Sequence, residues 1–260
     1  MGYFVRTESN VNLYVEDLNP EGNRTIVFVH GWPLNHHLFE YQYNVLPEMG
    51  FRCIGIDQRG FGKSDKPWGG YDYNRMADDI WMVIQTLQLQ NITLVGHSMA
   101  GAISIRYMAR HNGYGVSKLV LVDAAAPTGF TKETAAQLFS KASNDRPNML
   151  EDVADIFFYK NTSRPFSEWF IRMGLEAGSW STLKTIISLR DENVAPDLAQ
   201  IFVPTLIIHG IHDQVIPFSQ SHILHQSIRN SYVIPFKYSG HGPVWEEKDK
   251  FNQELVNFIR

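Results

Sequence analysis

The stretch Asn91–His111, NITLVGHSMAGAISIRYMARH, carries the pattern that decides the fold. Its first half, ITLVGH, is an apolar run typical of a strand buried on both faces, and its second half has the apolar spacing of a helix. The six residues between them, Gly96–Gly101, leave no room for a relaxed loop. The sequence therefore predicts a sharp strand-to-helix turn with Ser98 at its apex.

A turn of this kind is typical of the G-x-S-x-G nucleophile elbow, in which the serine adopts a strained backbone conformation. Small residues are then needed two positions to either side, and Gly96 and Ala100 occupy those positions here. At the start of a helix, the hydroxyl of Ser98 is exposed at the top of the sheet. The Met99 N–H then points toward an oxyanion formed on a carbonyl that Ser98 attacks.

The rest of the chain alternates between strand and helix patterns. Strands are predicted for YFVRT and VNLYVEDL, which alternate like an antiparallel hairpin, for the apolar runs TIVFVHG, FRCIGID, KLVLVDA and PTLIIHG, and for SYVIPF, whose Pro235 favours an edge strand. Helices are predicted for HLFEYQYNVLPEMG, YNRMADDIWMVIQTLQL, QSHILHQSI and KDKFNQELVNFIR. With the elbow strand, the eight runs predict a doubly wound, mostly parallel α/β sheet flanked by helices.

The alternation stops between residues 127 and 197, where only helical patterns rich in Phe and Trp are found. We interpret this segment as a helical cap inserted into a core made of residues 1–126 and 198–260. Most of its aromatic residues are expected to pack the cap on the core. Trp32, Phe130, Phe157 and Phe166 are predicted to bind substrate.

To act as a nucleophile, a serine hydroxyl needs a base, and the base needs an acid that orients it. In this type of fold the acid follows the serine along the chain, and the histidine base follows the acid. Asp213 follows the strand TLIIHG after a short turn, and His241 lies between two glycines after SYVIPF. We predict Ser98 as nucleophile, Asp213 as acid and His241 as base. Asp123, at another strand end, is the rival acid.

The remaining candidates are weaker. His30-Gly31-Trp32-Pro33 follows a central strand, and the Trp32 N–H is predicted as the second oxyanion donor because Pro33 has none. Seven histidines without motif context are expected to be surface or packing residues: His36, His37, His111, His209, His212, His222 and His225. His36 and His37 are adjacent, a spacing that is poor for binding one metal ion, and we predict no metal site.

Composition excludes several classes of protein. The net charge of the 260 residues is −4 and no basic cluster is present, which argues against nucleic acid and membrane surfaces as partners. No apolar run is long enough to cross a bilayer, no signal peptide is visible, and the single cysteine, Cys53, forms no internal disulfide. We expect a cytoplasmic protein with a small-molecule substrate, and a homo-oligomer stays possible.

The loop DQRGFGKSDKPWGGYDY matches neither phosphate-binding glycine motif. We interpret it as a structural loop in which Asp57 and Arg59 form hydrogen bonds around the elbow.

On these motifs the chain resembles the α/β-hydrolases, and more narrowly the cofactor-free haloperoxidase and aryl-esterase group of serine hydrolases. VHGWPLNHHLFEYQ, LVGHSMAGAISIRYMARH, PTLIIHGIHDQVIP and GHGPVWEEKDKFNQELVNFI stand in the expected order. The resemblance implies the same triad, backbone donors at Trp32 and Met99, and no cofactor. Ala100, where the group usually has glycine, is a departure.

The resemblance and the residues together predict a carboxylesterase that cleaves small to medium apolar esters, with perhydrolysis as a side activity. Two alternatives stay open: a carbon–carbon bond hydrolase with the same triad, and a ligand receptor with a slow triad. A haloalkane dehalogenase is disfavoured because its nucleophile would be an aspartate in the position of Ser98.

Overall fold

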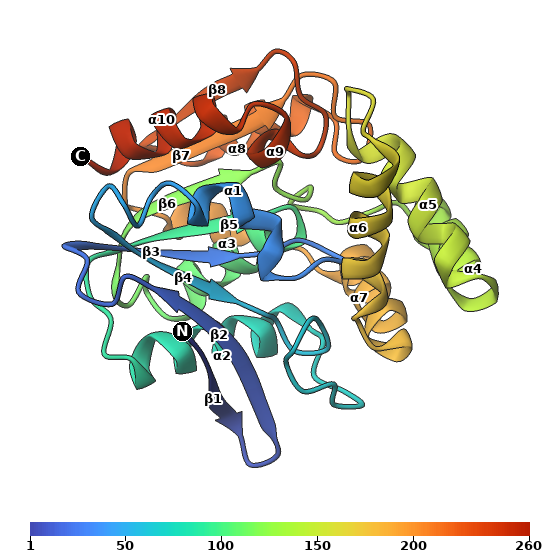
Figure 1. Ribbon diagram of the computed structural model, residues 1–260, viewed down its shortest axis with the longest axis horizontal. Coiled ribbons are helices and arrows are strands. Elements are labelled where there is room, and N and C mark those ends of the chain that lie inside the picture. The colour runs from blue at the N-terminus through green and yellow to red at the C-terminus, as the bar shows by residue number, and fades with distance from the viewer.

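The structure is a computed structural model that describes all residues from 1 to 260. Its centre is an eight-stranded sheet with the strand order β1-β2-β4-β3-β5-β6-β7-β8 (Figure 1). All neighbouring strands from β4 onward in this order run parallel, and only the β1–β2 and β2–β4 pairs are antiparallel. The predicted fold class is confirmed, including the hairpin at one edge and the strand with Pro235 at the other.

The strands correspond to the predicted runs. Their bounds are β1 Gly2–Glu8, β2 Val11–Leu18, β3 Arg24–Val29, β4 Phe51–Ile56, β5 Ile92–His97, β6 Val116–Val122, β7 Thr205–Gly210 and β8 Ser231–Phe236. Every residue of β5 and β7 is buried, as expected for central parallel strands covered on both faces. The carboxyl ends of β3, β5, β7 and β8 lead directly into the loops that carry the candidate site.

Helices cover both faces of the sheet. α2 (Tyr73–Thr86) packs against α3 (Met99–Arg110), and α8 (Ser219–Ser227) contacts β7 and β8. The short helices α1 (Glu40–Tyr43) and α9 (Pro243–Glu246) pack with α10 (Lys248–Ile259), which lies in front of the sheet in Figure 1. No helix combines the length and apolar character needed to cross a membrane.

The helix predicted over HLFEYQYNVLPEMG is the exception. Only η1 (His36–Phe39, a 3-10 turn) and α1 form, and residues 44–50 follow as turns. Gly50 there has a φ of +89°, and the Phe51 N–H donates to Leu46 O, which closes the turn instead of extending a helix. Pro47, which has no N–H, also disfavours a continuous helix across this stretch.

Between β6 and β7 the chain forms helices and no strand. These are α4 (Lys132–Asn144), α5 (Arg146–Phe157), α6 (Arg164–Leu175), α7 (Ser179–Asp191) and the 3-10 helix η2 (Ala195–Gln200). In Figure 1, α4–α7 lie together beyond one end of the strands. We call α4–α7 the cap helices.

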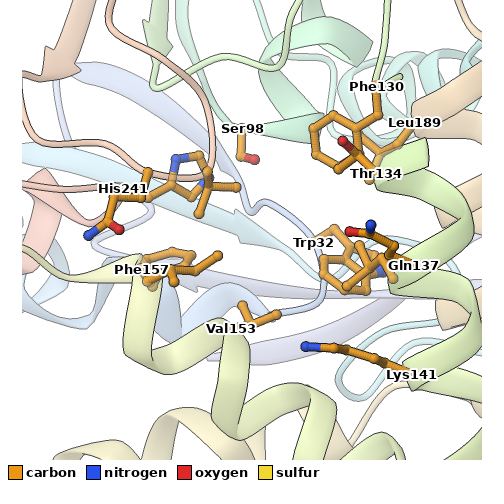
Figure 2. Close-up of a pocket in the computed structure, with 14 residues that line it drawn as sticks. Trp32, Ser98, Phe130, Thr134, Gln137, Lys141, Val153, Phe157, Leu189 and His241 are labelled. Carbon is orange, nitrogen blue, oxygen red and sulfur yellow. The ribbon is translucent and has the colours of Figure 1, made fainter. Parts of the chain in front are cut away.

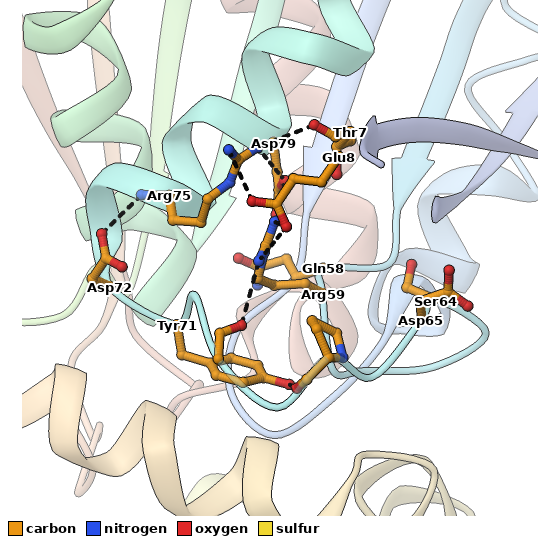
Figure 3. A network of polar contacts seen from close by, with 12 residues as sticks. Thr7, Glu8, Gln58, Arg59, Ser64, Asp65, Tyr71, Asp72, Arg75 and Asp79 are labelled. Carbon is orange, nitrogen blue, oxygen red and sulfur yellow. Dashed lines mark hydrogen bonds and ion pairs between the residues drawn. The ribbon is translucent and has the colours of Figure 1, made fainter. Parts of the chain in front are cut away.

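The glycine-containing loop of residues 57–72 joins the cap to the core (Figure 3). The Tyr71 hydroxyl lies 2.7 Å from Ser181 Oγ in α7, and Ser188 Oγ donates to Tyr71 O at 2.7 Å. A prediction for this loop is wrong: Arg59 is buried and donates to both carboxylate oxygens of Asp79 in α2, at 2.5 and 2.8 Å, and does not contact the elbow. Asp57 instead accepts hydrogen bonds from the backbone and ring of His36.

Candidate active site

Ser98 stands at the junction of β5 and α3. Its φ of +53° and ψ of −121° lie in a region that side chains with a Cβ rarely adopt. The strained conformation holds because the surrounding backbone is tied down: Ser98 N donates to Val122 O at 2.8 Å, and Ser98 O accepts from both Gly101 N and Ala125 N. The turn therefore presents the side chain at the carboxyl edge of the sheet.

The small residues around Ser98 are required by close contacts. A Cβ on Gly96 would lie 2.5 Å from Ser104 Oγ and 2.6 Å from Ala100 O. A Cβ on Gly101 would lie 2.5 Å from the Cβ of Ala124, so α3 packs directly on the segment after β6. Ala100 is fully buried, and its methyl group is accommodated at the position where the resemblance expects glycine.

The loop after β3 passes close to the serine. A Cβ on Gly31 would lie 2.8 Å from Ser98 Cβ and 2.5 Å from His97 Nδ1, so only glycine lets this backbone approach. The Trp32 N–H that follows makes no hydrogen bond within the protein. Met99 is the first residue of α3, and its N–H has no intrahelical acceptor. Two backbone donors thus stand on either side of Ser98, one in the β3 loop and one at the start of α3.

His241 and Asp213 form a buried pair. His241 Nδ1 lies 2.6 Å from Asp213 Oδ2, and the two side chains are 1% and 0% exposed. The other oxygen of Asp213 accepts hydrogen bonds from Val215 N and Ile216 N, both at 2.8 Å. Burial alone would raise the pKa of Asp213, but the charges of His241 and His209 and the side-chain hydrogen bonds to them hold it well below the usual carboxyl range. Asp213 is therefore ionised at neutral pH and fixes the ring of His241.

The other nitrogen of that ring, Nε2, has no partner within the protein. His241 Nε2 is buried and makes no hydrogen bond within the protein, neither with Ser98 Oγ nor with any other group. Both residues line the same cavity, as Figure 2 shows. Such catalytic hydrogen bonds are often long before substrate binds. The structure thus brings Ser98, Asp213 and His241 together from three loops.

Asp123, the rival acid, lies in the same buried cluster but does not contact His241 by a hydrogen bond. Its Oδ1 accepts from Gly210 N at 2.8 Å and its Oδ2 has no partner. Burial, reinforced by the charge of Asp213, raises the pKa of Asp123 to about 7. His209 stands between the two acids, with its Nε2 3.8 Å from Asp123 Oδ1 and 3.4 Å from Asp213 Oδ2.

His209 is a residue of the site that the sequence analysis grouped with surface and packing histidines. It lies on β7, four residues before Asp213, and its Nε2 lies 2.9 Å from Ile216 O. Through these contacts His209 supports the turn that carries Asp213. The sequence feature that could have identified His209 as a site residue is its position at the carboxyl end of a strand predicted to be central.

Two further histidines are fully buried near the site in neutral form. Burial lowers the pKa of His97 to about 3 and that of His30 to about 4. His97 Nε2 lies 2.8 Å from His241 O, and His30 Nε2 accepts from Gln58 N at 3.0 Å. These side chains brace the backbone of the base and of the β3 loop.

The cap also holds the base in place. Phe157, the last residue of α5, accepts a hydrogen bond at its carbonyl from His241 N at 2.7 Å, and its ring meets the His241 ring edge-on at 4.8 Å. Glu246 of α9 accepts from Gly240 N, and its other oxygen accepts from the N–H groups of Tyr159 and Lys160. The carboxylate of Glu246 therefore clamps the His241 loop to the chain that leaves α5.

A cavity of about 210 Å³ lies over Ser98 and His241, between the core and the cap helices (Figure 2). Most of its wall is apolar. The lining residues are Trp32, Ser98, Phe130, Thr134, Gln137, Leu138, Lys141, Val153, Ile156, Phe157, Leu189, Gln214, Val215 and His241.

Of the four residues predicted to bind substrate, Trp32, Phe130 and Phe157 line this cavity, and Phe166 does not. Phe166 packs edge-on against Phe158 and Trp245, and it belongs to an aromatic cluster between α6 and α9. Its side chain supports the cap on the core. Gln137 and Lys141 are lining residues that sequence reasoning missed, because their helix shows an ordinary surface pattern.

Comparison with known proteins identifies the family. Residues 24–148 match the model of the alpha/beta hydrolase fold. The AB hydrolase superfamily protein YisY of Bacillus subtilis (strain 168) is 48% identical over 267 aligned positions, which cover 99% of either chain. The chain belongs to the α/β-hydrolase family.

Other relatives place the hydrolase near the predicted group. The bifunctional esterase/perhydrolase DCH of Acinetobacter calcoaceticus is 31% identical, with all of both chains covered. The structure of the esterase EaEST from Exiguobacterium antarcticum is similar with a TM-score of 0.96 and 42% identity, over 100% of this chain and 99% of that one. Further relatives are named non-heme chloroperoxidases, so the resemblance to the haloperoxidase and esterase group is confirmed.

Two buried groups of side chains in the hydrolase bring possible metal ligands within 4.8 Å of one another. They are His97, Asp123 and His241, and Asp123, His209 and Asp213. In the second group, His209 Nε2 and both oxygens of Asp213 already have hydrogen-bond partners within the protein. In the first group, His241 Nδ1 is held by Asp213, whereas His97 Nδ1, Asp123 Oδ2 and His241 Nε2 have no hydrogen-bond partner within the protein.

Proposed function

We propose that the hydrolase cleaves carboxylic esters through a covalent acyl-enzyme on Ser98. The observation that carries the proposal is the buried His241–Asp213 hydrogen bond of 2.6 Å, which leaves His241 Nε2 unpartnered at the cavity that Ser98 lines. A histidine held in this way keeps its proton on Nδ1 and offers Nε2 as a base.

In the first half of the reaction, Ser98 Oγ attacks the ester carbonyl while His241 Nε2 takes its proton. Asp213 stabilises the imidazolium that forms, since it is ionised and directly bonded to the ring. The C–O bond to the alcohol then breaks, and His241 returns the proton to the departing oxygen. In the second half, His241 deprotonates a water molecule that attacks the acyl-enzyme; the bond between the acyl carbon and Ser98 Oγ then breaks, His241 returns the proton to Ser98 Oγ, and the acid leaves.

The negative oxygen formed in both halves is stabilised by the backbone N–H groups of Trp32 and Met99. Both are fixed before substrate arrives, Trp32 by the approach of Gly31 to Ser98 and Met99 by the helix that follows. Donors held in this way contribute about 3 kcal/mol each in comparable sites.

The cavity supports small to medium substrates with substantial apolar surface. Its volume of about 210 Å³ and its aromatic walls at Trp32, Phe130 and Phe157 fit a short acyl chain or an aryl group. Perhydrolysis, in which peroxide replaces water in the second half, is supported as a side activity by the relative named an esterase/perhydrolase.

The test combines labelling and turnover. Wild-type protein is treated with a fluorophosphonate, digested and analysed by mass spectrometry, and its hydrolysis of 4-nitrophenyl acetate is compared with that of Ser98→Ala. The proposal expects a single labelled peptide containing Ser98 and a loss of turnover to background in the variant. Ser143→Ala, on the exposed surface of α4, is the matched control and should behave as wild type.

Equal hydrolysis by wild type and Ser98→Ala would refute the serine mechanism. Efficient cleavage of a vinylogous diketone with no ester turnover would identify the carbon–carbon hydrolase instead. Labelling at Ser98 with turnover far below once per second on every ester would favour the ligand receptor.

A further inference from the structure

One wall of the cavity is polar, and it comes from a single helix face. Thr134, Gln137, Leu138 and Lys141 of α4 all line the cavity. Their spacing of i, i+3, i+4 and i+7 places them on one side of the helix. Figure 2 shows Thr134, Gln137 and Lys141 directed toward the space that Ser98 and His241 reach from the opposite side.

This wall is open to solvent: Thr134, Gln137 and Lys141 are exposed and Leu138 is half-buried, although all four line the cavity. Helices of a cap usually turn an apolar stripe inward, and α4 does so elsewhere, where Ala135 and Ala142 are buried. At the cavity, three of its four lining residues carry hydrogen-bonding groups. Other cavity walls carry Val153, Phe157 and Leu189.

Lys141 supplies the only formal charge in the lining apart from the titratable His241, because no carboxylate and no arginine lines the cavity. Its ammonium group donates to Asp152 Oδ2 of α5 at 2.6 Å. Asp152 is not a lining residue, and the two side chains are 56% and 43% exposed. An ammonium has three donors, so this exposed pair leaves two for a group inside the cavity.

From this arrangement we propose that the preferred esters carry a carboxylate at the end remote from the scissile carbonyl, where Lys141 binds it with help from Gln137. The inference rests on the proposed function, since it assumes that Ser98 attacks at the other end of the cavity. Apolar walls bind the middle of such a substrate, and the polar face of α4 binds its charged end. Asp152 competes for the same ammonium and moderates the preference.

The experiment compares two pairs of substrates that differ in one negative charge. The first pair is the mono-4-nitrophenyl ester of glutaric acid and its methyl ester, which varies the acyl part. The second pair is 4-acetoxybenzoate and its methyl ester, which varies the alcohol part. For each pair the ratio of kcat/KM for the anionic ester to that for the neutral ester is measured in every variant, so that intrinsic reactivity cancels between variants.

Lys141→Met is expected to lower this ratio about twofold to fivefold for at least one pair, as for an exposed ion pair. Asp152→Asn is expected to raise the ratio for the same pair. Lys132→Met removes an equal charge from the exposed start of α4 outside the cavity, and should leave the ratio as in wild type. The effect of Lys141 should shrink at high ionic strength.

The inference is overturned if Lys141→Met leaves the ratio of anionic to neutral kcat/KM unchanged for both pairs. It is also overturned if Lys132→Met lowers that ratio as much as Lys141→Met does. Either result, with neutral esters still cleaved and Ser98→Ala inactive, leaves the proposed function intact. Loss of neutral-ester turnover in Lys141→Met would show that the residue acts on the fold of the cap and would also count against the inference.

Discussion

Replacing Asp213 with asparagine tests the orientation of the base most directly. The Oδ1 atom of Asp213 accepts hydrogen bonds from Val215 N and Ile216 N, so an asparagine would keep its carbonyl oxygen there. Its NH₂ group would then face His241 Nδ1, which in the wild type lies 2.6 Å from Oδ2. The asparagine NH₂ and the His241 Nδ1–H are both donors and cannot hydrogen-bond to each other. The imidazole therefore moves its proton from Nδ1 to Nε2.

The size of the effect follows from this change of tautomer. A protonated Nε2 cannot accept the proton of Ser98, and the equivalent change in serine proteases lowers kcat by about 10⁴. That factor corresponds to about 5 kcal/mol in the activation free energy. Asp213 does not line the cavity, so KM is expected to stay close to its wild-type value.

Asp123→Asn is the matched control, because it makes the same chemical change in the neighbouring acid. Asp123 Oδ1 accepts a hydrogen bond from Gly210 N, and its Oδ2 has no partner. Because its pKa is raised to about 7, about half of the carboxyl groups are neutral at pH 7, and most are neutral at pH 6. Asparagine imitates the neutral acid. We therefore expect Asp123→Asn to retain most of its activity at pH 6.

The assay is initial-rate hydrolysis of 4-nitrophenyl acetate between pH 6 and 8, with circular dichroism to verify folding of both variants. A loss in Asp123→Asn as large as that in Asp213→Asn would refute the assignment of Asp213 as the sole orienting acid. Full activity in a folded Asp213→Asn would refute the triad.

Four further outcomes are expected. Glu246→Gln leaves one of three clamped N–H groups facing an amide NH₂, which costs about 1–3 kcal/mol, so calorimetry should show a lower Tm and kinetics a fall in kcat with little change in KM. Gly31→Ala places a methyl group 2.8 Å from Ser98 Cβ and should lower kcat/KM about a hundredfold in a folded protein, whereas unchanged kinetics would contradict the close approach. Arg59→Met removes two hydrogen bonds from the buried carboxylate of Asp79, which keeps Arg75 Nη2 as a partner, and should destabilise the protein by about 1.5–3 kcal/mol in urea titrations; a stability within error of wild type would exclude a structural role. Because the pKa of Asp123 is raised, its contribution to stability falls as pH rises from the ordinary carboxyl range to about 7, so Asp123→Asn should lose less Tm than wild type between pH 5 and pH 8.

The parts of the site that were predictable are those that local backbone chemistry dictates. The turn at Ser98 needs Gly96 before it and a small residue after it, and this requirement leaves a mark in a few adjacent residues. Asp213 and His241 were predictable because the parallel strands bring the carboxyl ends of β7 and β8 to the same edge of the sheet as that of β5, with β6 between β5 and β7. The same reasoning also identified Asp123 as a rival acid, but it could not predict the hydrogen bond to His241 that distinguishes Asp213 from Asp123.

The parts that were missed depend on packing between distant segments. His209 was indistinguishable from other histidines until β7 placed it between two acids. Arg59 was assigned to the elbow, although its guanidinium finds a carboxylate in α2, 20 residues along the chain. Phe166 was predicted to line the cavity and does not, and Lys141 lines it without having been predicted, because an apolar pattern does not state which neighbour a helix face of the cap will meet.

The contacts of the cap divide it into a part tied to catalysis and a part that is free to vary. The end of α5 holds His241, through the hydrogen bond from His241 N to Phe157 O, so we expect changes there to alter catalysis and binding together. α4 packs on α5 and α7 and lines the cavity, but none of its residues forms a hydrogen bond with the side chain of Ser98, Asp213 or His241. Substitutions on the inner face of α4 therefore change which ester fits without moving His241. A change of substrate class in this hydrolase is expected to begin at Gln137 and Lys141 and to leave Phe157 in place.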